Sequence, residues 1–140
     1  MLVRLLLLGL GGALGTLARY AVGLWCQRRM GGAFPYGTLA VNVAGSFLLG
    51  VVMQLSAATD LLGPTARLTL GTGVMGGFTT YSTFNYETLK LLQDRAWLTA
   101  GINLVATVAG CLVGGLVGIA LASHVAAELG LGTSKRLVGG

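Results

Sequence analysis

Four long apolar stretches, separated by short polar segments, dominate the pattern of hydrophobic and polar residues along the chain. The stretches cover residues 2–26, 38–58, 68–92 and 97–122. Each one reaches the roughly 20 apolar residues that a helix needs to cross a bilayer. The connectors are residues 27–36, 59–67 and 93–96. Because the connectors are short, neighbouring helices must run antiparallel, and the pattern predicts an all-α membrane protein with four transmembrane helices.

The composition agrees with a chain embedded in a lipid bilayer. Of its 140 residues, 54% are hydrophobic and 9% are charged, whereas soluble domains carry about 25% charged residues. We therefore expect one four-helix unit over residues 1–129 and no soluble domain. Residues 130–140 are rich in Gly and basic residues and lack apolar periodicity. They predict a disordered tail, which an expression vector could have supplied.

The basic residues are scattered along the chain, although the net charge is +5. This distribution argues against a nucleic-acid partner. One side of the predicted membrane carries Arg4, Arg67, Lys135 and Arg136, and the other carries Arg28, Arg29, Lys90 and Arg95. Such a balance gives only a weak orientation under the positive-inside rule. Our hypothesis is dual topology, in which copies insert both ways and pair as an antiparallel homodimer.

Glycine recurs at intervals of four residues in three of the apolar stretches. The repeats are Gly11 and Gly15, Gly73 and Gly77, and Gly110, Gly114 and Gly118. Small residues at this spacing let helix backbones approach closely within a membrane. Four helices of this size enclose too little space for a pore and its wall, so the repeats also favour a homo-oligomer.

The third apolar stretch contains a polar segment that is poor material for a helix. Residues 76–85 read GGFTTYSTFN, with two glycines and four hydroxyl side chains of Ser and Thr. Gly is about 1 kcal/mol worse than Ala in a helix, and Ser and Thr can bond to the backbone instead. We predict a helix break here, where freed carbonyls can coordinate a cation. The alternative is a simple kink whose polar groups the hydroxyls satisfy.

Polar side chains also share faces of the second and fourth predicted helices. Asn42 and Ser46 are four residues apart, and Asn103, Thr107 and Cys111 repeat that spacing. Residues at this spacing lie on one face, and the second set draws a line of about 12 Å at the usual helical rise. Such a line suits an ion path. The alternative is ordinary hydrogen bonding between helices.

Arg19, Glu87, Tyr81 and Phe84 allow two interpretations each. Arg19 lies inside the first apolar stretch, where it either attracts anions into a wet vestibule or reaches the lipid headgroups. Glu87 either lines an entrance or pairs with Lys90, and the pairing is the simpler interpretation. The rings of Tyr81 and Phe84, three residues apart, either pack in the protein or turn their positive edges toward a small anion.

Three segments resemble the Fluc (CrcB-type) fluoride channel family. They are residues 11–15 with Arg19 and Tyr20, residues 35–42 with 45–47, and residues 76–84. The resemblance spans all four predicted helices. It implies an antiparallel, dual-topology homodimer with two pores in the plasma membrane, the inner membrane of a bacterium. Such a channel exports fluoride passively and so limits its toxicity in the cytoplasm.

The resemblance also implies roles for individual residues. Asn42 lines the pore, and Tyr81 and Phe84 take two stacked aromatic positions along it. Main-chain carbonyls of Gly76 and Thr79 hold a structural sodium ion at the centre of the dimer. The other pore positions are Ser46, Ser82, Thr83, Asn103 and Thr107, with Arg19 at the vestibule. Two residues depart from the family pattern, which usually has Phe at position 81 and often Ser at position 111.

Two other functions are open to a chain of this kind. A dual-topology small multidrug transporter has a similar size, but it needs an acidic residue in its first helix, and no Asp or Glu precedes Asp60. A structural membrane subunit would account for the glycine repeats but not for the polar residues of the third and fourth stretches. We expect no enzyme, because the sequence shows neither a nucleophile with a base nor a metal cluster.

Overall fold

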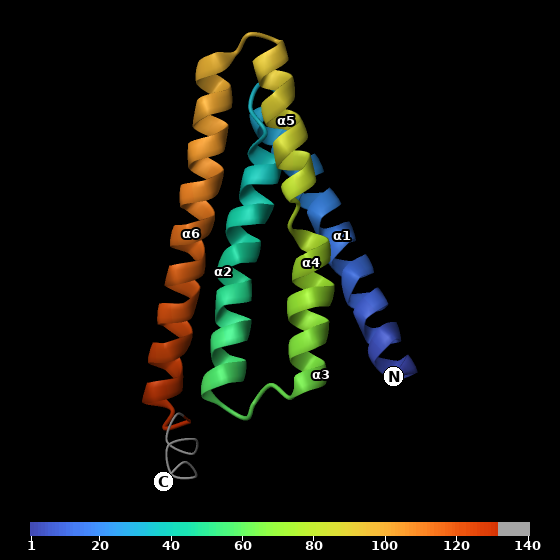
Figure 1. The fold of residues 1–140 in the computed structure, drawn as a ribbon, viewed down its shortest axis with the longest axis vertical. Coiled ribbons are helices and arrows are strands. Elements are labelled where there is room, and N and C mark those ends of the chain that lie inside the picture. Colours follow the sequence, from blue (N-terminus) through green and yellow to red (C-terminus); the bar gives the residue numbers. More distant parts are fainter. Residues whose placement is uncertain (132–140) are drawn as a thin grey trace.

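The structure is a computed structural model that describes residues 1–131, and helices joined by short loops make up this part of the chain. In chain order the elements are α1 Leu2–Met30, α2 Tyr36–Ala58, α3 Pro64–Arg67, η1 Leu68–Met75, α4 Gly76–Phe78, α5 Tyr81–Gln93 and α6 Trp97–Glu128 (Figure 1). The element η1 is a π-helix, and the others are α-helices. No strand occurs within residues 1–131, so the predicted all-α class is confirmed.

Three helices, α1, α2 and α6, are long and apolar enough to cross a membrane. The sequence pattern predicts four such helices. The apolar stretch 68–92 is instead divided among η1, α4 and α5, which have 8, 3 and 13 residues. A helix of this last length is only about 20 Å long, whereas the hydrocarbon core of a bilayer is about 30 Å thick. No single helix of this stretch is therefore long enough to span.

The helices extend beyond the apolar stretches that the sequence pattern delimits. α1 continues through Arg28 and Arg29, α6 continues beyond residue 122 to Glu128, and α3 takes up Pro64–Arg67. Two physical reasons are visible. Basic side chains in the last turn interact favourably with the negative end of the helix dipole, and proline is well suited to the first turn of a helix. Apolar character alone therefore underestimates helix length here.

Glycines bring α1 into close contact with η1 and α4. A side-chain carbon at Gly15 would overlap the carbonyl oxygen of Val74, and one at Gly77 would overlap that of Gly12. The obstacles are main-chain atoms, so only glycine permits this approach. The predicted role of these repeats in close packing is confirmed.

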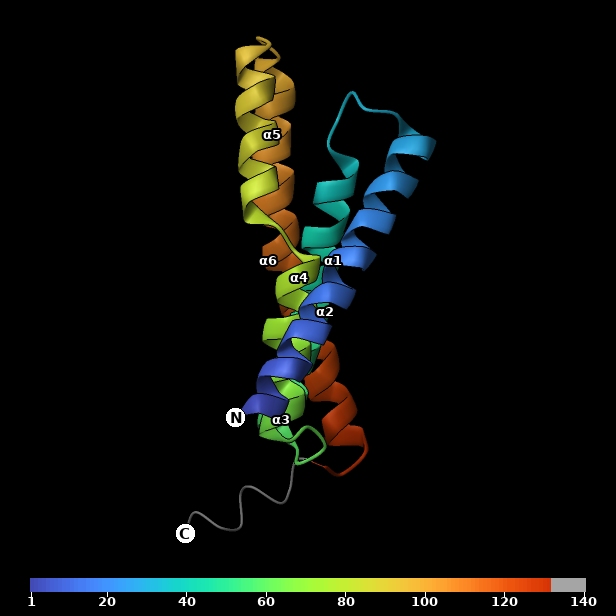
Figure 2. The same ribbon diagram turned by 90° about the vertical axis from the view of Figure 1, so that its right-hand side faces the viewer.

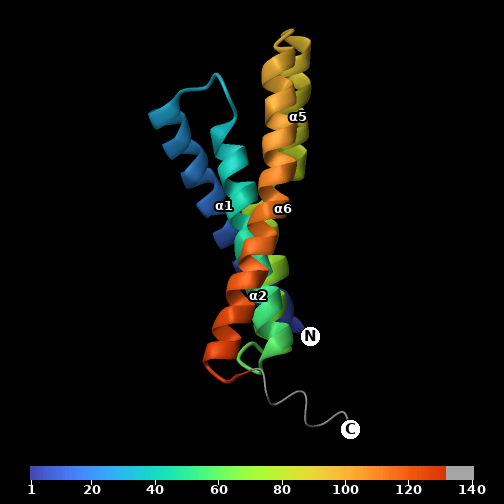
Figure 3. The same cartoon turned by 90° about the vertical axis from the view of Figure 1, so that its left-hand side faces the viewer.

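A second glycine contact joins α2 and α6, which lie side by side in Figures 1 and 3. A side-chain carbon at Gly118 would overlap the Phe47 carbonyl oxygen, and one at Gly114 would lie 3.0 Å from the carbonyl oxygen of Val43. This contact holds the bundle together along the α2–α6 pair.

The α1–α2 hairpin and the α5–α6 hairpin diverge toward one end of the molecule. Figure 2 shows the loop between α1 and α2 standing apart from the loop between α5 and α6. A cavity lies in this region, and its walls come from α1, α2 and α5.

Helix α6 ends in a glycine turn at the start of the predicted tail. Gly130 has a left-handed φ of 64°, and the Leu131 N–H donates to the Ala126 carbonyl at 3.0 Å. This is the geometry in which a glycine closes a helix. Gly130 and Leu131 therefore form the turn that closes α6. Residues 132–140 lie outside the described residues, so the predicted disorder there stays a prediction.

Candidate functional site

The backbone leaves the helical conformation at Thr79 and Thr80, between α4 and α5. Their φ and ψ angles are −83° and 160° for Thr79 and −154° and 107° for Thr80. The Thr79 N–H and hydroxyl both donate to the Met75 carbonyl, at 3.0 and 2.9 Å, and close the preceding helix. Extended residues cannot continue a helical hydrogen-bond ladder, so the polar groups of Thr80 need other partners.

Asn42 of α2 provides those partners. Its Nδ2 donates to the Thr80 carbonyl at 3.0 Å, and its Oδ1 accepts from the Thr80 N–H at 2.7 Å. Each of the two residues is only 7% exposed. The pair of bonds determines the orientation of the carboxamide, because a flipped amide would place donor against donor. One Nδ2 proton of Asn42 remains for a further acceptor.

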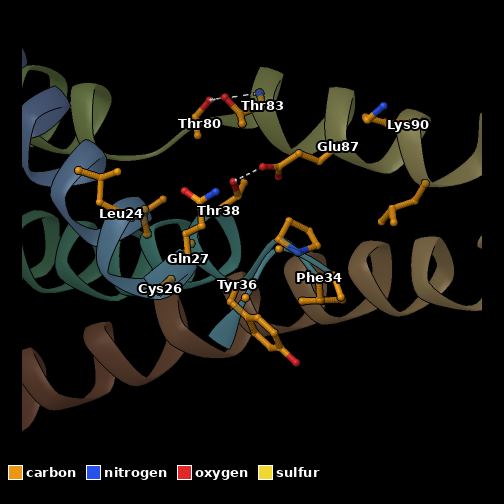
Figure 4. A pocket seen from close by; sticks show the side chains of 18 of the residues that line it. Leu24, Cys26, Gln27, Phe34, Tyr36, Thr38, Thr80, Thr83, Glu87 and Lys90 are labelled. Carbon is orange, nitrogen blue, oxygen red and sulfur yellow. Dashed lines mark hydrogen bonds between the residues drawn. The ribbon is translucent and has the colours of Figure 1, made fainter. Parts of the chain in front are cut away.

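The Thr80 hydroxyl caps the first turn of α5. It accepts from the Thr83 N–H at 3.3 Å and donates to the Thr83 hydroxyl at 2.9 Å (Figure 4). The Ser82 hydroxyl lies 3.4 Å from the same oxygen. A helix N-terminus carries partial positive charge. The structure thus brings Asn42, Thr80, Ser82 and Thr83 together at the positive end of a helix.

The two predicted aromatic residues form a tilted pair on α5. The ring centroids of Tyr81 and Phe84 are 5.8 Å apart, with 59° between the ring planes. Their surroundings differ, because Phe84 is 4% exposed and Tyr81 is 77% exposed. Phe84 therefore belongs to the interior of the chain, and Tyr81 projects from its surface.

A second line of polar groups joins α5 to α6. The Thr88 hydroxyl donates to the Phe84 carbonyl at 2.8 Å and accepts from Asn103 Nδ2 at 2.8 Å. Asn103 is fully buried, and Thr107, one turn further along α6, is 5% exposed. Asn103 Oδ1 and the Thr107 hydroxyl are buried without a hydrogen-bond partner in the described part of the chain. These groups do not bond to Asn42, so the predicted polar residues form two groups.

Figure 4 shows side chains that line the cavity between the diverging hairpins. The cavity has a volume of about 730 Å³, and Arg19 of α1 lies in its wall. Glu87 faces it from α5 and accepts a hydrogen bond of 2.9 Å from the Thr38 hydroxyl of α2. The Nζ atom of Lys90 instead lies 4.0 Å from Oδ2 of Asp94. The expected pairing of Glu87 with Lys90 is therefore wrong, because the Glu87 side chain is directed toward α2.

Three remaining candidates lie outside the Asn42 group. Ser46 is half-buried on α2, and its carbonyl oxygen lies 3.8 Å from where a side-chain carbon at Gly115 of α6 would stand. Cys111 is a free, half-buried thiol on α6. Gly76 has open space where a side chain would begin.

Sequence reasoning missed three residues of the site, namely Thr38, Thr80 and Thr88. A signal existed for two of them. Thr38 precedes Asn42 by one helical turn and so shares its face, and Thr80 is followed three residues later by Thr83, a spacing compatible with an N-cap. Thr88 gave no comparable signal, because its partner Asn103 lies on another helix.

The fold and this site define a multi-pass helical membrane protein, with polar groups gathered around the two extended residues Thr79 and Thr80, the non-helical step. The chain belongs to the family described as CrcB-like protein, Camphor Resistance (CrcB), whose model matches residues 6–119. It is similar to several proteins named fluoride-specific ion channel FluC. The one from Sorangium cellulosum is 55% identical over 120 residues, which cover 86% of this chain and 94% of that protein.

Two further relatives with the same name show similar coverage. The protein from Anaeromyxobacter sp. (strain K) is 54% identical over 112 residues, covering 80% of this chain and 89% of that protein. The protein from Geobacter metallireducens is 47% identical over 118 residues, covering 84% and 95%. The region that the family model matches includes every residue of the candidate site.

Proposed function

We propose that this chain is a fluoride-selective channel that exports fluoride passively across the plasma membrane, the inner membrane of a bacterium, and so lowers fluoride toxicity. The observation that carries the proposal is the similarity, at 43% to 55% identity, to relatives named fluoride-specific ion channel. In this function the chain is a channel and not an enzyme.

The donors around the non-helical step suit a small, strongly hydrated anion. A selective pore must replace the ion's water with closely placed partial charges and still release the ion. The proposed pore residues are Asn42, Ser46, Tyr81, Ser82, Thr83, Phe84, Asn103 and Thr107. Amide, hydroxyl and ring-edge groups supply partial positive charge without a full charge that would trap the ion. Arg19, in the wall of the cavity, would attract anions to the vestibule.

We propose that η1, α4 and α5 together form one broken transmembrane span, which completes the four spans of the subunit over residues 1–129. Non-helical backbone survives at membrane depth only where protein buries it or a wet cavity adjoins it. Asn42 buries one side of the step at Thr80. On this assignment the step lies near the middle of the membrane.

The proposed assembly is an antiparallel, dual-topology homodimer with two pores. Helix α5 carries the polar residues Ser82, Thr83 and Asn85, which are exposed on the single chain. Polar side chains inside a membrane normally face protein or water rather than lipid. A second, inverted copy would cover this face, while the exposed leucines of α1 would meet lipid. The nearly balanced charges at the two ends of the helices are compatible with insertion in both directions.

A structural sodium ion at the dimer centre would be held by the main-chain carbonyls of Gly76 and Thr79. The residues fit such an ion in two respects. Thr80 gives its N–H to Asn42 rather than to the Gly76 carbonyl, and unwound backbone carbonyls are established ligands for sodium in membrane proteins. When bound, the ion would stabilise main-chain carbonyls that lack a helical donor.

The direct test is fluoride efflux from liposomes that contain only the purified protein. We expect rapid fluoride efflux, measured with a fluoride electrode, and chloride efflux at the level of protein-free liposomes. A non-conducting structural subunit would pass neither ion, and a cation-coupled drug transporter would not pass fluoride. Absence of fluoride efflux from folded, reconstituted protein would overturn the proposal.

The ring pair provides a sharper test of the pore. Phe84→Ile is expected to slow fluoride efflux by about tenfold, equivalent to about 1.4 kcal/mol of barrier, because it removes a buried ring edge while keeping apolar bulk. Tyr81→Phe removes only a hydroxyl from a side chain that is 77% exposed. It should leave the rate within about twofold. Wild-type rates in both variants would remove the rings from the mechanism.

A further inference from the structure

Asn42 makes contacts that a simple pore-lining residue would not need. Both ends of its carboxamide are engaged by the backbone of one residue, Thr80, which lies 38 positions away in the sequence. A group that served only to contact a passing ion would gain nothing from this pairing. The bonds resemble those that a neighbouring main chain would make, with one donated and one accepted.

The pairing changes what the Gly76 carbonyl can do. In a continuous helix the Thr80 N–H would donate to the carbonyl four residues earlier, which is that of Gly76. Here the same N–H donates to Asn42 Oδ1 at 2.7 Å. The Gly76 carbonyl therefore loses its helical donor and becomes available to a ligand.

We propose that Asn42 is a positioning residue that holds Thr80 in its extended conformation and thereby frees the Gly76 carbonyl to bind a cation. The inference rests on the proposed sodium site and assigns control of that site to α2. One residue then links the two proposed features of the subunit, because the remaining Nδ2 proton of Asn42 can face the pore while its other polar atoms hold the backbone. Loss of Asn42 should affect cation binding even where fluoride is absent.

The test compares purified wild-type protein with Asn42→Ala in the absence of fluoride. Exchanging choline chloride for sodium chloride should raise the melting temperature of the wild type by about 4 °C. Asn42→Ala should abolish this rise. Asn42→Ser, a milder change whose side chain is too short to make both bonds, should do the same if Asn42→Ala proves unstable. The control is Ser123→Ala, which removes one bond within α6 and should keep the full rise.

A second measurement reads the backbone directly. Carbon-13 shifts of Thr80 in threonine-labelled protein should indicate an extended residue in the wild type and should move toward helical values in Asn42→Ala. Unchanged Thr80 shifts in Asn42→Ala would overturn the positioning role. A sodium-dependent rise that persists in Asn42→Ala, or that is missing from the wild type, would overturn the link to the cation. Fluoride efflux of the wild type is scored separately, so failure of the channel proposal can be recognised independently.

Discussion

Gly45→Ala is expected to destabilise the folded protein and lower its yield, and the additional change Thr79→Ser is expected to restore both. Gly45 is buried on α2, and a side-chain carbon there would overlap Cγ2 of Thr79. Thr79 cannot rotate this methyl group away without losing the hydrogen bond from its hydroxyl to Met75. Overpacking of this kind typically costs about 1–3 kcal/mol, and here it would push the non-helical step away from Asn42.

The rescue follows from the chemistry of the second substitution. Serine keeps the hydroxyl that bonds to Met75 and lacks the methyl group that obstructs a side chain at position 45. After this change the nearest neighbours of the new carbon are Phe78 Cδ1 at 3.3 Å and the Cβ atom of residue 79 at 3.7 Å, which a small adjustment can accommodate. The measurement is the yield of monodisperse protein in size-exclusion chromatography, followed by fluoride efflux of each folded variant.

Thr79→Ser alone is the matched control. It should remain folded and lose only about 0.8 kcal/mol for the missing methyl group. Normal yield from Gly45→Ala by itself would contradict the prediction. So would a double variant with a yield no higher than that of Gly45→Ala, because the obstacle would then lie elsewhere.

The apolar pattern predicted the all-α class, and the glycine spacings predicted the closest contacts between helices. Residues such as Gly15 and Gly118 could be assigned to close contacts because the reason for glycine is local, namely that a backbone must pass where a side chain would stand. The place where the third stretch becomes extended, at Thr79 and Thr80, lies among residues whose weak helix propensity was also a local property. Such features depend on a few neighbouring residues and can be deduced from them.

The partners of the polar side chains could not be deduced in this way. Asn42 and Ser46 share a helix face by spacing, yet Asn42 bonds to Thr80 and is buried, while Ser46 is only half-buried. Glu87 could reach Lys90 along its own helix, but it accepts a bond from Thr38 on α2 instead. These outcomes depend on how each helix is rotated about its axis. That rotation is decided by contacts between distant segments, which no spacing along one helix reveals.

Gly15→Ala is expected to have an effect as large as Gly45→Ala but with no simple rescue. The new side-chain carbon would overlap the Val74 carbonyl oxygen and would lie 2.8 Å from the Phe78 nitrogen. Both obstacles are main-chain atoms, so no change of rotamer relieves them. α1 would have to move away from η1 and α4, and the polar step that follows α4 would lose its support.

Gly9→Ala is the matched control for this effect. It lies on the same helix, has no atom within 4 Å of the new carbon, and gains the same helix propensity of about 1 kcal/mol. Gly9→Ala should therefore match or exceed the wild type in melting temperature, whereas Gly15→Ala should yield little or no folded protein. Equal yields and melting temperatures for the two variants would contradict the prediction, because they would show that α1 can move away from η1 and α4 without loss of the fold. The difference between them isolates the contact, because the intrinsic gain in helix propensity is common to both.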